Sequence, residues 1–144
     1  MNEYAIKQLS VFIENKKGEL NEAMSLLFEE DIIIKSLLLL DSTDFGILRL
    51  IVDHPDRAKE ILSNAGYAAR INEVFAVGVE DEIGKFYKVT KILSDHDINI
   101  LYTYAFREKE TGVFVFKVDG GDFEKATKVL KENQMDVISA SNFH

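Results

Sequence analysis

The sequence predicts an α+β fold in which one unit, β-α-β-β-α-β, occurs twice in the chain. Residues 11–20 and residues 77–86, which lie 66 positions further on, both read as strand, tight loop and helix. At this offset ten of the 43 positions from 11 to 53 are identical, whereas unrelated segments of ordinary composition would share about three. The chain is therefore a tandem duplication. In first-copy numbering the identical positions are Val11, Glu14, Gly18, Leu27, Asp31, Ile32, Ile34, Gly46, Val52 and Asp53.

Hydrophobic periodicity defines the elements of the first copy. Apolar residues alternate at 9–13, which indicates a strand with one buried face. Apolar side chains then recur at intervals of three and four residues over 20–28, which is typical of an amphipathic helix. A run rich in leucine and isoleucine at 32–41 and an alternating run at 47–52 predict two more strands, separated by a polar turn.

A second helix and a fourth strand complete this copy. Pro55 can occupy the first turn of a helix without the loss of a hydrogen bond, and Gly66 is placed to end that helix. Residues 68–72 are predicted as a short strand. The second copy repeats the order, with strands expected at 74–79, 98–106, 113–118 and 137–140 and helices expected at 85–94 and from 122 onwards.

This element order is that of the ferredoxin-like fold, a four-stranded antiparallel sheet with two helices on one face. We expect two units, residues 1–72 and residues 73–144, each of 72 residues. Units of this size are small enough that burial of surface against the twin should matter. No spacer rich in Pro, Gly or Ser separates them, so they are predicted to be rigidly joined.

Composition and charge exclude several classes of function. Of the 144 residues 47% are hydrophobic and 29% are charged, and the net charge is −8. An acidic surface argues against nucleic-acid binding, which depends on clustered basic residues. Without cysteine the chain has no disulfide, thiolate nucleophile or iron–sulfur cluster. Because no apolar run is long enough to span a bilayer and the start is unlike a leader, we expect a cytoplasmic protein that does not bind membranes.

Candidate catalytic and metal-binding residues are few. His54, His96 and His144 have no spacing that suggests a catalytic relay or a ligand set. The segment 95–97, Asp-His-Asp, is the one metal-like cluster, but consecutive residues project in different directions from a helix end, so we interpret it as a solvated terminus. We therefore predict no enzyme activity, no metal and no cofactor.

The first loop resembles that of a known family. Residues 14–20, Glu-Asn-Lys-Lys-Gly-Glu-Leu, resemble the signature of ACT domains, small regulatory modules that bind amino acids, in which Asp or Asn is followed by Pro-Gly and a hydrophobic residue. The family's proline is replaced by Lys17 in the first copy and by Ile83 in the second. The resemblance covers the whole chain, once per repeat. It implies two modules joined into an eight-stranded antiparallel sheet with the helices on one face, and a small effector at the seam.

The chemistry of the loop is compatible with such a site. A helix that begins at Gly18 or Glu19 presents unpaired backbone N–H groups and the positive end of its dipole, to which a carboxylate can bind. Glycine permits close approach of the backbone to a ligand, and the Asn15 amide offers both a donor and an acceptor. The same residues also have a structural interpretation, in which Asn15 caps the helix and Gly18 turns the chain.

Two pseudo-symmetric sites are predicted, and they should be unequal. In a paired arrangement of this family's type, loop 15–20 is expected to meet residues 97–101, where Asn99 is the counterpart of Ile33 in the first copy. The predicted ligand-binding residues are Asn15, Lys16, Lys17, Gly18, Glu19, Leu20, Ile98, Asn99, Ile100 and Leu101. The weaker second site is assigned to Asp81, Ile83, Gly84, Lys85, Phe86 and Ile33.

Loop charge supports the same ranking of the two sites. Residues 15–17, Asn-Lys-Lys, attract a carboxylate, whereas residues 80–82, Glu-Asp-Glu, repel it. We thus predict an amino-acid-binding regulatory or sensor protein that acts on an unknown regulated protein. The family resemblance adds a homodimer as an expectation. The alternative is a protein–protein interaction or oligomerisation module with no small-molecule ligand.

Overall fold

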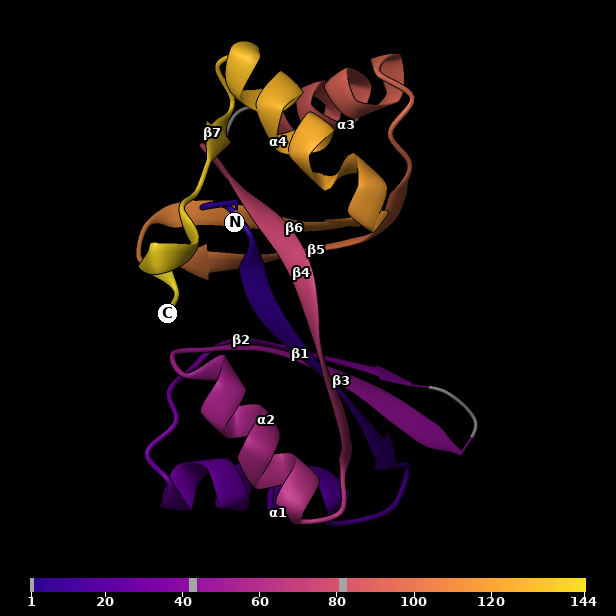
Figure 1. The fold of residues 1–144 in the computed structure, drawn as a ribbon, viewed down its shortest axis with the longest axis vertical. Helices are drawn as coiled ribbons and strands as arrows, with labels where there is room; N and C mark the ends of the chain where they lie inside the picture. Colours follow the sequence, from indigo (N-terminus) through magenta and orange to yellow (C-terminus); the bar gives the residue numbers. More distant parts are fainter. Residues whose placement is uncertain (1, 42–43, 81–82) are drawn as a thin grey trace. The chain divides into compact units, whose positions relative to one another are not determined.

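The computed structural model describes residues 2–41, 44–80 and 83–144. The chain forms two compact units, and each joins one repeat to a short segment from the opposite end of the chain. The first-repeat unit comprises Lys7–Asn72 and Phe143–His144 (Figure 1). The second-repeat unit comprises Glu73–Asn142 and Met1–Ile6.

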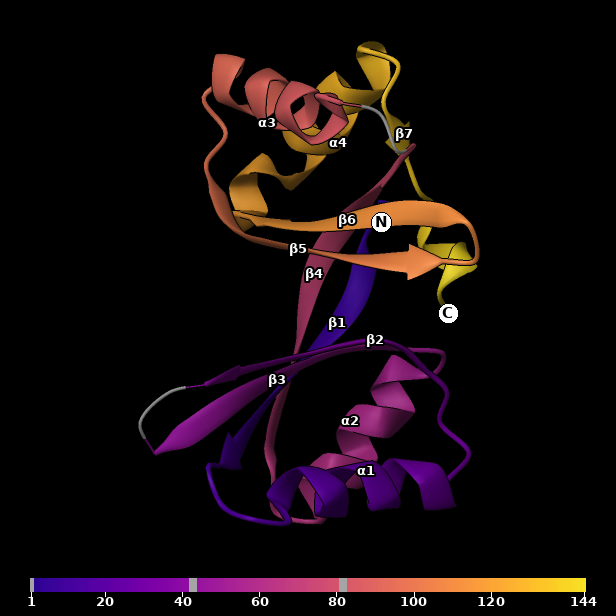
Figure 2. The ribbon, with the colours of Figure 1, turned by 180° about the vertical axis from the view of Figure 1, so that it is seen from behind.

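Two helices cover one face of an antiparallel sheet in the first-repeat unit (Figure 2). The elements are β1 (Ile6–Glu14), α1 (Glu19–Glu29), β2 (Ile34–Asp41), β3 (Phe45–Val52), α2 (Pro55–Asn64) and the start of β4 (Ala68–Val79). The strand order is β2-β3-β1. Leu9 lies opposite Leu50 and Val11 lies opposite Leu48. Because directly paired residues of an antiparallel sheet share a face, these four side chains point toward the helices together.

The core of this unit follows the apolar periodicity of its sequence. Ala23 and Leu27 are buried one helical turn apart on α1, and Ala58 and Leu62 are buried in the same way on α2. Burial of a leucine-sized side chain stabilises the fold by about 1.5 to 3 kcal/mol. The buried cluster consists of Leu9, Val11, Ile13, Ala23, Leu27, Ile32, Leu48, Leu50, Val52, Ala58 and Leu62.

The second-repeat unit has the same design (Figure 2). Its elements after β4 are α3 (Lys85–Asp95), β5 (Ile100–Glu108), β6 (Thr111–Val118), α4 (Phe123–Glu132) and β7 (Asp136–Val137), with short 3₁₀ helices at Gly120–Asp122 and Ala140–Asn142. Antiparallel pairing orders the strands β5-β6-β4-β7. The helices lie on one side of this sheet, as in the first repeat.

Phenylalanine rings dominate the core of the second-repeat unit. Phe75 and Phe116 stack with ring centroids 5.5 Å apart, and Phe123 meets Phe75 edge-on at 5.7 Å. Phe86, predicted for the weaker ligand site, lies 4.5 Å from Phe114 between ring centroids. Each such aromatic pair stabilises the fold by about 0.5 to 1.5 kcal/mol beyond the contribution of the buried ring area. In this structure Phe86 therefore packs at the edge of the core.

The expectation of eight strands is wrong, since the described residues contain seven. The strands predicted at 68–72 and 74–79 are one continuous strand, β4 (Ala68–Val79). The predicted boundary between the two strands falls at Asn72-Glu73. Neither residue is a glycine or a proline, and so the backbone has no reason to leave the extended conformation there. The α+β class and the two ferredoxin-like units are confirmed.

The second-repeat unit includes the start of the chain. The Asn2 amide donates to Thr127 Oγ1 at 3.3 Å, and the Ala140 N–H donates to the Glu3 carbonyl at 2.9 Å. Lys131 donates to the Tyr4 hydroxyl.

In the part of the chain that the structure describes, no helix is long and apolar enough to cross a membrane.

Candidate functional site

Glycine in the left-handed conformation starts the first helix of each repeat. Gly18 precedes α1 with φ +90° and Gly84 precedes α3 with φ +89°, and neither cap position has a side-chain hydrogen bond. Only glycine adopts this conformation without strain. Asn15 therefore does not cap α1, and the structural interpretation holds for Gly18 alone. The first N–H groups of each helix have no partner within the helix.

Acidic residues surround the start of α1. Lys16 Nζ lies 2.6 Å from Glu14 Oε2, and this hydrogen bond with the charge of Glu14 raises the pKa of Lys16 above its ordinary value. Glu19 and Glu22 occupy the first turn. The positive charge that the sequence assigned to loop 15–17 is thus largely compensated. The first turn of α3 contains no acid. The prediction of an acidic second loop at residues 80–82 stays a prediction, since Asp81 and Glu82 lie outside the described residues.

Each repeat has a cavity of about 340 Å³ where its first helix begins. In the first repeat the lining is Phe12, Glu14, Glu19, Glu22, Phe45, Ala65, Gly66, Tyr67 and Ala68. In the second it is Gly78, Val79, Glu80, Lys85, Thr111, Gln134, Met135 and Asp136. Burial raises the pKa of Tyr67, and the charges of Glu22 and Glu19 add to this effect. The negative charge of the first cavity disfavours a bound carboxylate.

A larger cavity of about 600 Å³ lies between α3 and the start of β5, within the second-repeat unit. It brings together three of the predicted residues, Ile98, Asn99 and Ile100, whereas Leu101 does not line it. The full lining is Tyr87, Thr90, Lys91, Ser94, Asp95, Ile98, Asn99 and Ile100.

Charged groups of both signs line this cavity. Lys91 Nζ lies 2.8 Å from Asp95 Oδ2, one helical turn away. The hydrogen bond to Asp95 and its charge raise the pKa of Lys91 above its ordinary value. Thr90 Oγ1 donates to the Tyr87 carbonyl at 2.9 Å. A cation, a carboxylate and the Asn99 amide therefore meet at one surface, next to two isoleucines.

Sequence reasoning missed the residues that α3 contributes. Tyr87, Lys91 and Asp95 recur every four residues, so they share one helical face that leads to the Asn99 turn. This spacing was a usable signal. In the first repeat the positions equivalent to Tyr87, Lys91 and Asp95 are Asn21, Ser25 and Glu29, which lack the cation. Apolar residues replace three other polar residues of the cavity, with Met24 for Thr90, Phe28 for Ser94 and Ile33 for Asn99.

His96, the central residue of the Asp-His-Asp segment, has a structural role. His96 ends α3, and its Nδ1 is paired with the Ile92 carbonyl at 2.8 Å, which satisfies a terminal carbonyl of the helix. Among residues 2–41, 44–80 and 83–144, no group of three His, Cys, Asp or Glu side chains is arranged to hold a metal ion.

The family model described as "ACT domain pair" matches residues 4–144. The chain belongs to the ACT domain pair family. The resemblance seen in its first loop is thus confirmed over both repeats. No curated protein matches this ACT domain pair.

Solved structures share the fold of this ACT domain pair. Protein BT0572 from Bacteroides thetaiotaomicron is 34% identical to this ACT domain pair over 97% of this chain and 96% of that chain, with a TM-score of 0.90. The ligand-free regulatory subunit of aspartate kinase from Thermus thermophilus is 15% identical over 90% of this chain and 92% of that chain, with a TM-score of 0.64. The regulatory subunit of aspartate kinase from Thermus flavus is 16% identical over 88% of this chain and 90% of that chain, with a TM-score of 0.61. The two subunits share the fold of this ACT domain pair.

Proposed function

We propose that this chain is a regulatory protein that binds a free amino acid in the α3–β5 cavity and has no catalytic activity of its own. The observation that carries the proposal is the meeting of Lys91, Asp95 and Asn99 at one cavity of a chain built as an ACT domain pair. Structural neighbours of this fold include regulatory subunits of aspartate kinase.

A zwitterion complements these three side chains. Its carboxylate would pair with the Lys91 ammonium and its ammonium would pair with the Asp95 carboxylate. Lys91 and Asp95 are 55% and 57% exposed, so their mutual ion pair is screened by water and weak. A ligand that separates the pair leaves both charges partnered. The Asn99 amide can donate to the carboxylate or accept from the ammonium.

The size and lining of the cavity fit a small molecule. Ligand pockets typically range from about 300 to 1,000 Å³ and combine apolar walls with a few polar groups. Here Ile98, Ile100 and Tyr87 offer the apolar wall, and Thr90 and Ser94 add hydroxyl groups. The ligand's side chain would lie against the isoleucines.

Loop 15–20 was predicted to complete the site. It belongs to the first-repeat unit, whereas residues 98–101 belong to the second-repeat unit, and their meeting stays a prediction. The Glu19 N–H already donates to the Lys16 carbonyl at 3.3 Å, and the glutamates around this helix start oppose an anion, so in the proposal the ligand carboxylate pairs with Lys91 instead. The weaker site around Gly84 likewise stays a prediction.

A thermal-shift screen of the twenty amino acids tests the proposal. A ligand present at 100 times its dissociation constant stabilises the fold by about 2.7 kcal/mol, so one or a few amino acids should raise Tm clearly. Lys91→Ala should abolish that shift. The matched control is Lys128→Ala, which removes another exposed i,i+4 ion pair, with Glu132 on α4, and should preserve the shift. Absence of a shift with every amino acid would favour the alternative, an interaction module without a small ligand.

A further inference from the structure

Three aromatic rings line the cavity at the start of α1. This cavity has a volume of about 340 Å³ and lies within the first-repeat unit. Phe12 of β1 and Phe45 of β3 contribute two of the rings, and Tyr67, in the turn between α2 and β4, contributes the third. Phe12 and Phe45 are 46% and 51% exposed. Exposed apolar side chains that surround a hollow are typical of ligand-binding sites.

Carboxylates line the same cavity as the rings. Glu14 of β1 lies opposite Phe45 of β3, so their side chains share a face of the sheet. Glu19 and Glu22 lie three residues apart in the first turn of α1, which makes them neighbours on the helix surface. Lys16 compensates the charge of Glu14. Among residues 2–41, 44–80 and 83–144, neither Glu19 nor Glu22 has an ion-pair partner, so two negative charges of this cavity are uncompensated.

The charges and the rings of this cavity both favour a cation. The start of a helix carries a partial positive charge equivalent to about half a unit, which the two full negative charges exceed. Burial raises the pKa of Tyr67, and the charges of Glu22 and Glu19 add to this effect, as expected for a negative potential at the hydroxyl group. The faces of aromatic rings also attract cations, because the ring quadrupole is negative there.

The equivalent cavity of the second repeat lacks both features. The positions 66 residues after the two phenylalanines are Gly78 and Thr111, and Met135 takes the place of the tyrosine after the second helix. Lys85 and Lys88 replace the two glutamates of α1. Two copies of one fold within the same chain thus differ in charge and in aromatic content at the same place. The rings and carboxylates of the first repeat therefore need an explanation other than the stability of the fold.

We propose that this cavity binds a small organic cation, an alkylammonium compound without a carboxylate. Its ammonium group pairs with the carboxylates of Glu19 and Glu22, and its alkyl chain packs against the three rings. The cavity volume of about 340 Å³ falls within the range typical of small ligands. The α3–β5 cavity, for which the proposed ligand is a zwitterion, belongs to the second-repeat unit, so neither proposal depends on the other.

An NMR titration of the full chain with n-pentylamine, which is protonated at neutral pH, tests the proposal. At low salt the backbone amide signals of the turn at residues 66–67 should shift saturably, whereas 1-pentanol, an uncharged molecule with the same alkyl chain, should shift them little. Glu19→Gln combined with Glu22→Gln should weaken amine binding about tenfold, because two ion pairs are lost. The matched control is Glu29→Gln combined with Glu60→Gln, which removes two exposed glutamates elsewhere in the first repeat and should preserve binding.

Phe12→Leu tests the contribution of the rings. Leucine keeps an apolar side chain but has no ring face, so amine binding should weaken about threefold. The matched control is Phe28→Leu, at an 80% exposed position near the end of α1, which should bind as the wild type does. Lys91→Ala, which tests the amino-acid site, should also leave amine binding unchanged. Equal shifts with 1-pentanol, wild-type affinity in the variant without Glu19 and Glu22, or equal effects of Phe12→Leu and Phe28→Leu would each overturn the proposal.

Discussion

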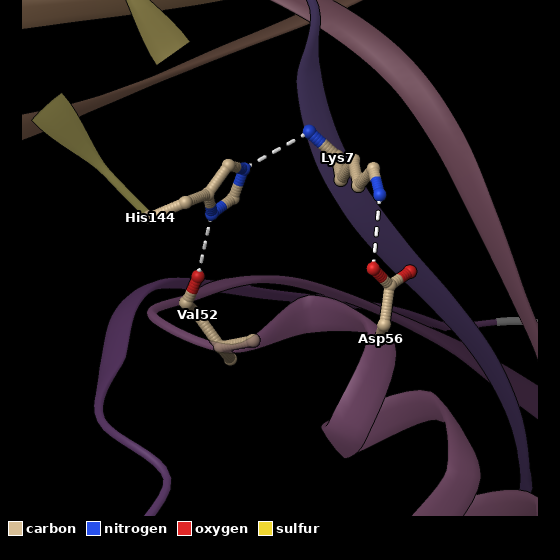
Figure 3. A network of polar contacts seen from close by, with 4 residues as sticks. All are labelled: Lys7, Val52, Asp56 and His144. Atoms are coloured by element: carbon tan, nitrogen blue, oxygen red, sulfur yellow. Dashed lines mark hydrogen bonds and ion pairs between the residues drawn. The ribbon is translucent and has the colours of Figure 1, made fainter. Parts of the chain in front are cut away.

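The backbone N–H of Lys7 donates a hydrogen bond to Nε2 of His144 at 3.1 Å, although the two residues are 137 positions apart (Figure 3). Because Nε2 accepts this bond, the ring proton belongs on Nδ1, which donates to the Val52 carbonyl at 2.9 Å. His144 thereby links β1 to the end of β3. The Lys7 side chain adds an ion pair with Asp56 on α2, with Nζ and Oδ2 2.9 Å apart.

Loss of the anchor formed by Phe143 and His144 should destabilise the first-repeat unit. Phe143 is only 2% exposed, so Phe143→Ala should lower the free energy of unfolding by about 3 to 5 kcal/mol. His144→Ala removes two hydrogen bonds and should cost about 1 to 3 kcal/mol. Asp56→Ala, which removes only an exposed ion pair, should change it by less than about 1 kcal/mol. Urea denaturation measures all three, and equal effects of Phe143→Ala and Asp56→Ala would contradict the packing.

Gly18→Ala and Gly84→Ala should each destabilise the chain through backbone strain alone. Nothing lies within 4 Å of an added Cβ at either position, so steric contact contributes no cost. The left-handed conformation should cost roughly 1 to 2 kcal/mol per alanine. Gly120→Ala is the control, since Gly120 also has open space but no positive φ. Thermal unfolding that shows the three variants to be equivalent would rule out the strain argument.

The ionisation of Lys91 should depend on Asp95. The hydrogen bond and charge of Asp95 raise the pKa of Lys91 above its ordinary value. When the pKa of a lysine is higher in the folded than in the unfolded state, its charge stabilises the folded state. This stabilisation is complete at a pH below the unfolded-state pKa, and it is lost as the pH rises through the folded-state pKa. An NMR titration of the Lys91 side chain should show that Asp95→Asn lowers this pKa toward its ordinary value. An unchanged titration would mean that Asp95 does not hold the Lys91 ammonium in solution.

Separation of the repeats should impair both. A cut between Asn72 and Glu73 interrupts the continuous strand β4 and leaves each fragment without the segment that the other end of the chain supplies. Fragment 73–144 would lack Tyr4 and Ile6, and fragment 1–72 would lack Phe143. We expect each fragment to unfold at a lower temperature than the intact chain or to aggregate. Two soluble, monomeric fragments with the Tm of the whole would contradict this expectation.

Periodicity in the sequence was enough to predict the paired β-α-β-β-α-β order, because alternating and helical apolar patterns report local burial. It could not show that β4 runs unbroken through Asn72, since strand ends depend on pairing partners. The placement of Phe143 beside the first repeat depends on contacts between distant segments, which no local pattern encodes.

Some residues of the candidate site could be predicted from the sequence, and others could be identified only from the structure. Asn99 was found by comparison of the repeats, because it differs from Ile33 at an equivalent position. Lys91 and Asp95 were missed, although their spacing places them on one helical face with Tyr87. The neutralising effect of Glu14 on Lys16 depends on side-chain positions, which the loop sequence alone does not give.

Isothermal titration calorimetry of the wild type and Asn99→Ala, with the amino acid that gives the largest thermal shift, tests the central claim most directly. We predict one strong site per chain. Loss of a polar group that leaves its bound partner unpaired costs on the order of 1 to 3 kcal/mol, so Asn99→Ala should weaken binding about 5-fold to 150-fold. Ile33→Ala, the matched change in the first repeat, should bind as the wild type does. Two equivalent sites per chain, or an Asn99→Ala variant with wild-type affinity, would contradict the proposed site.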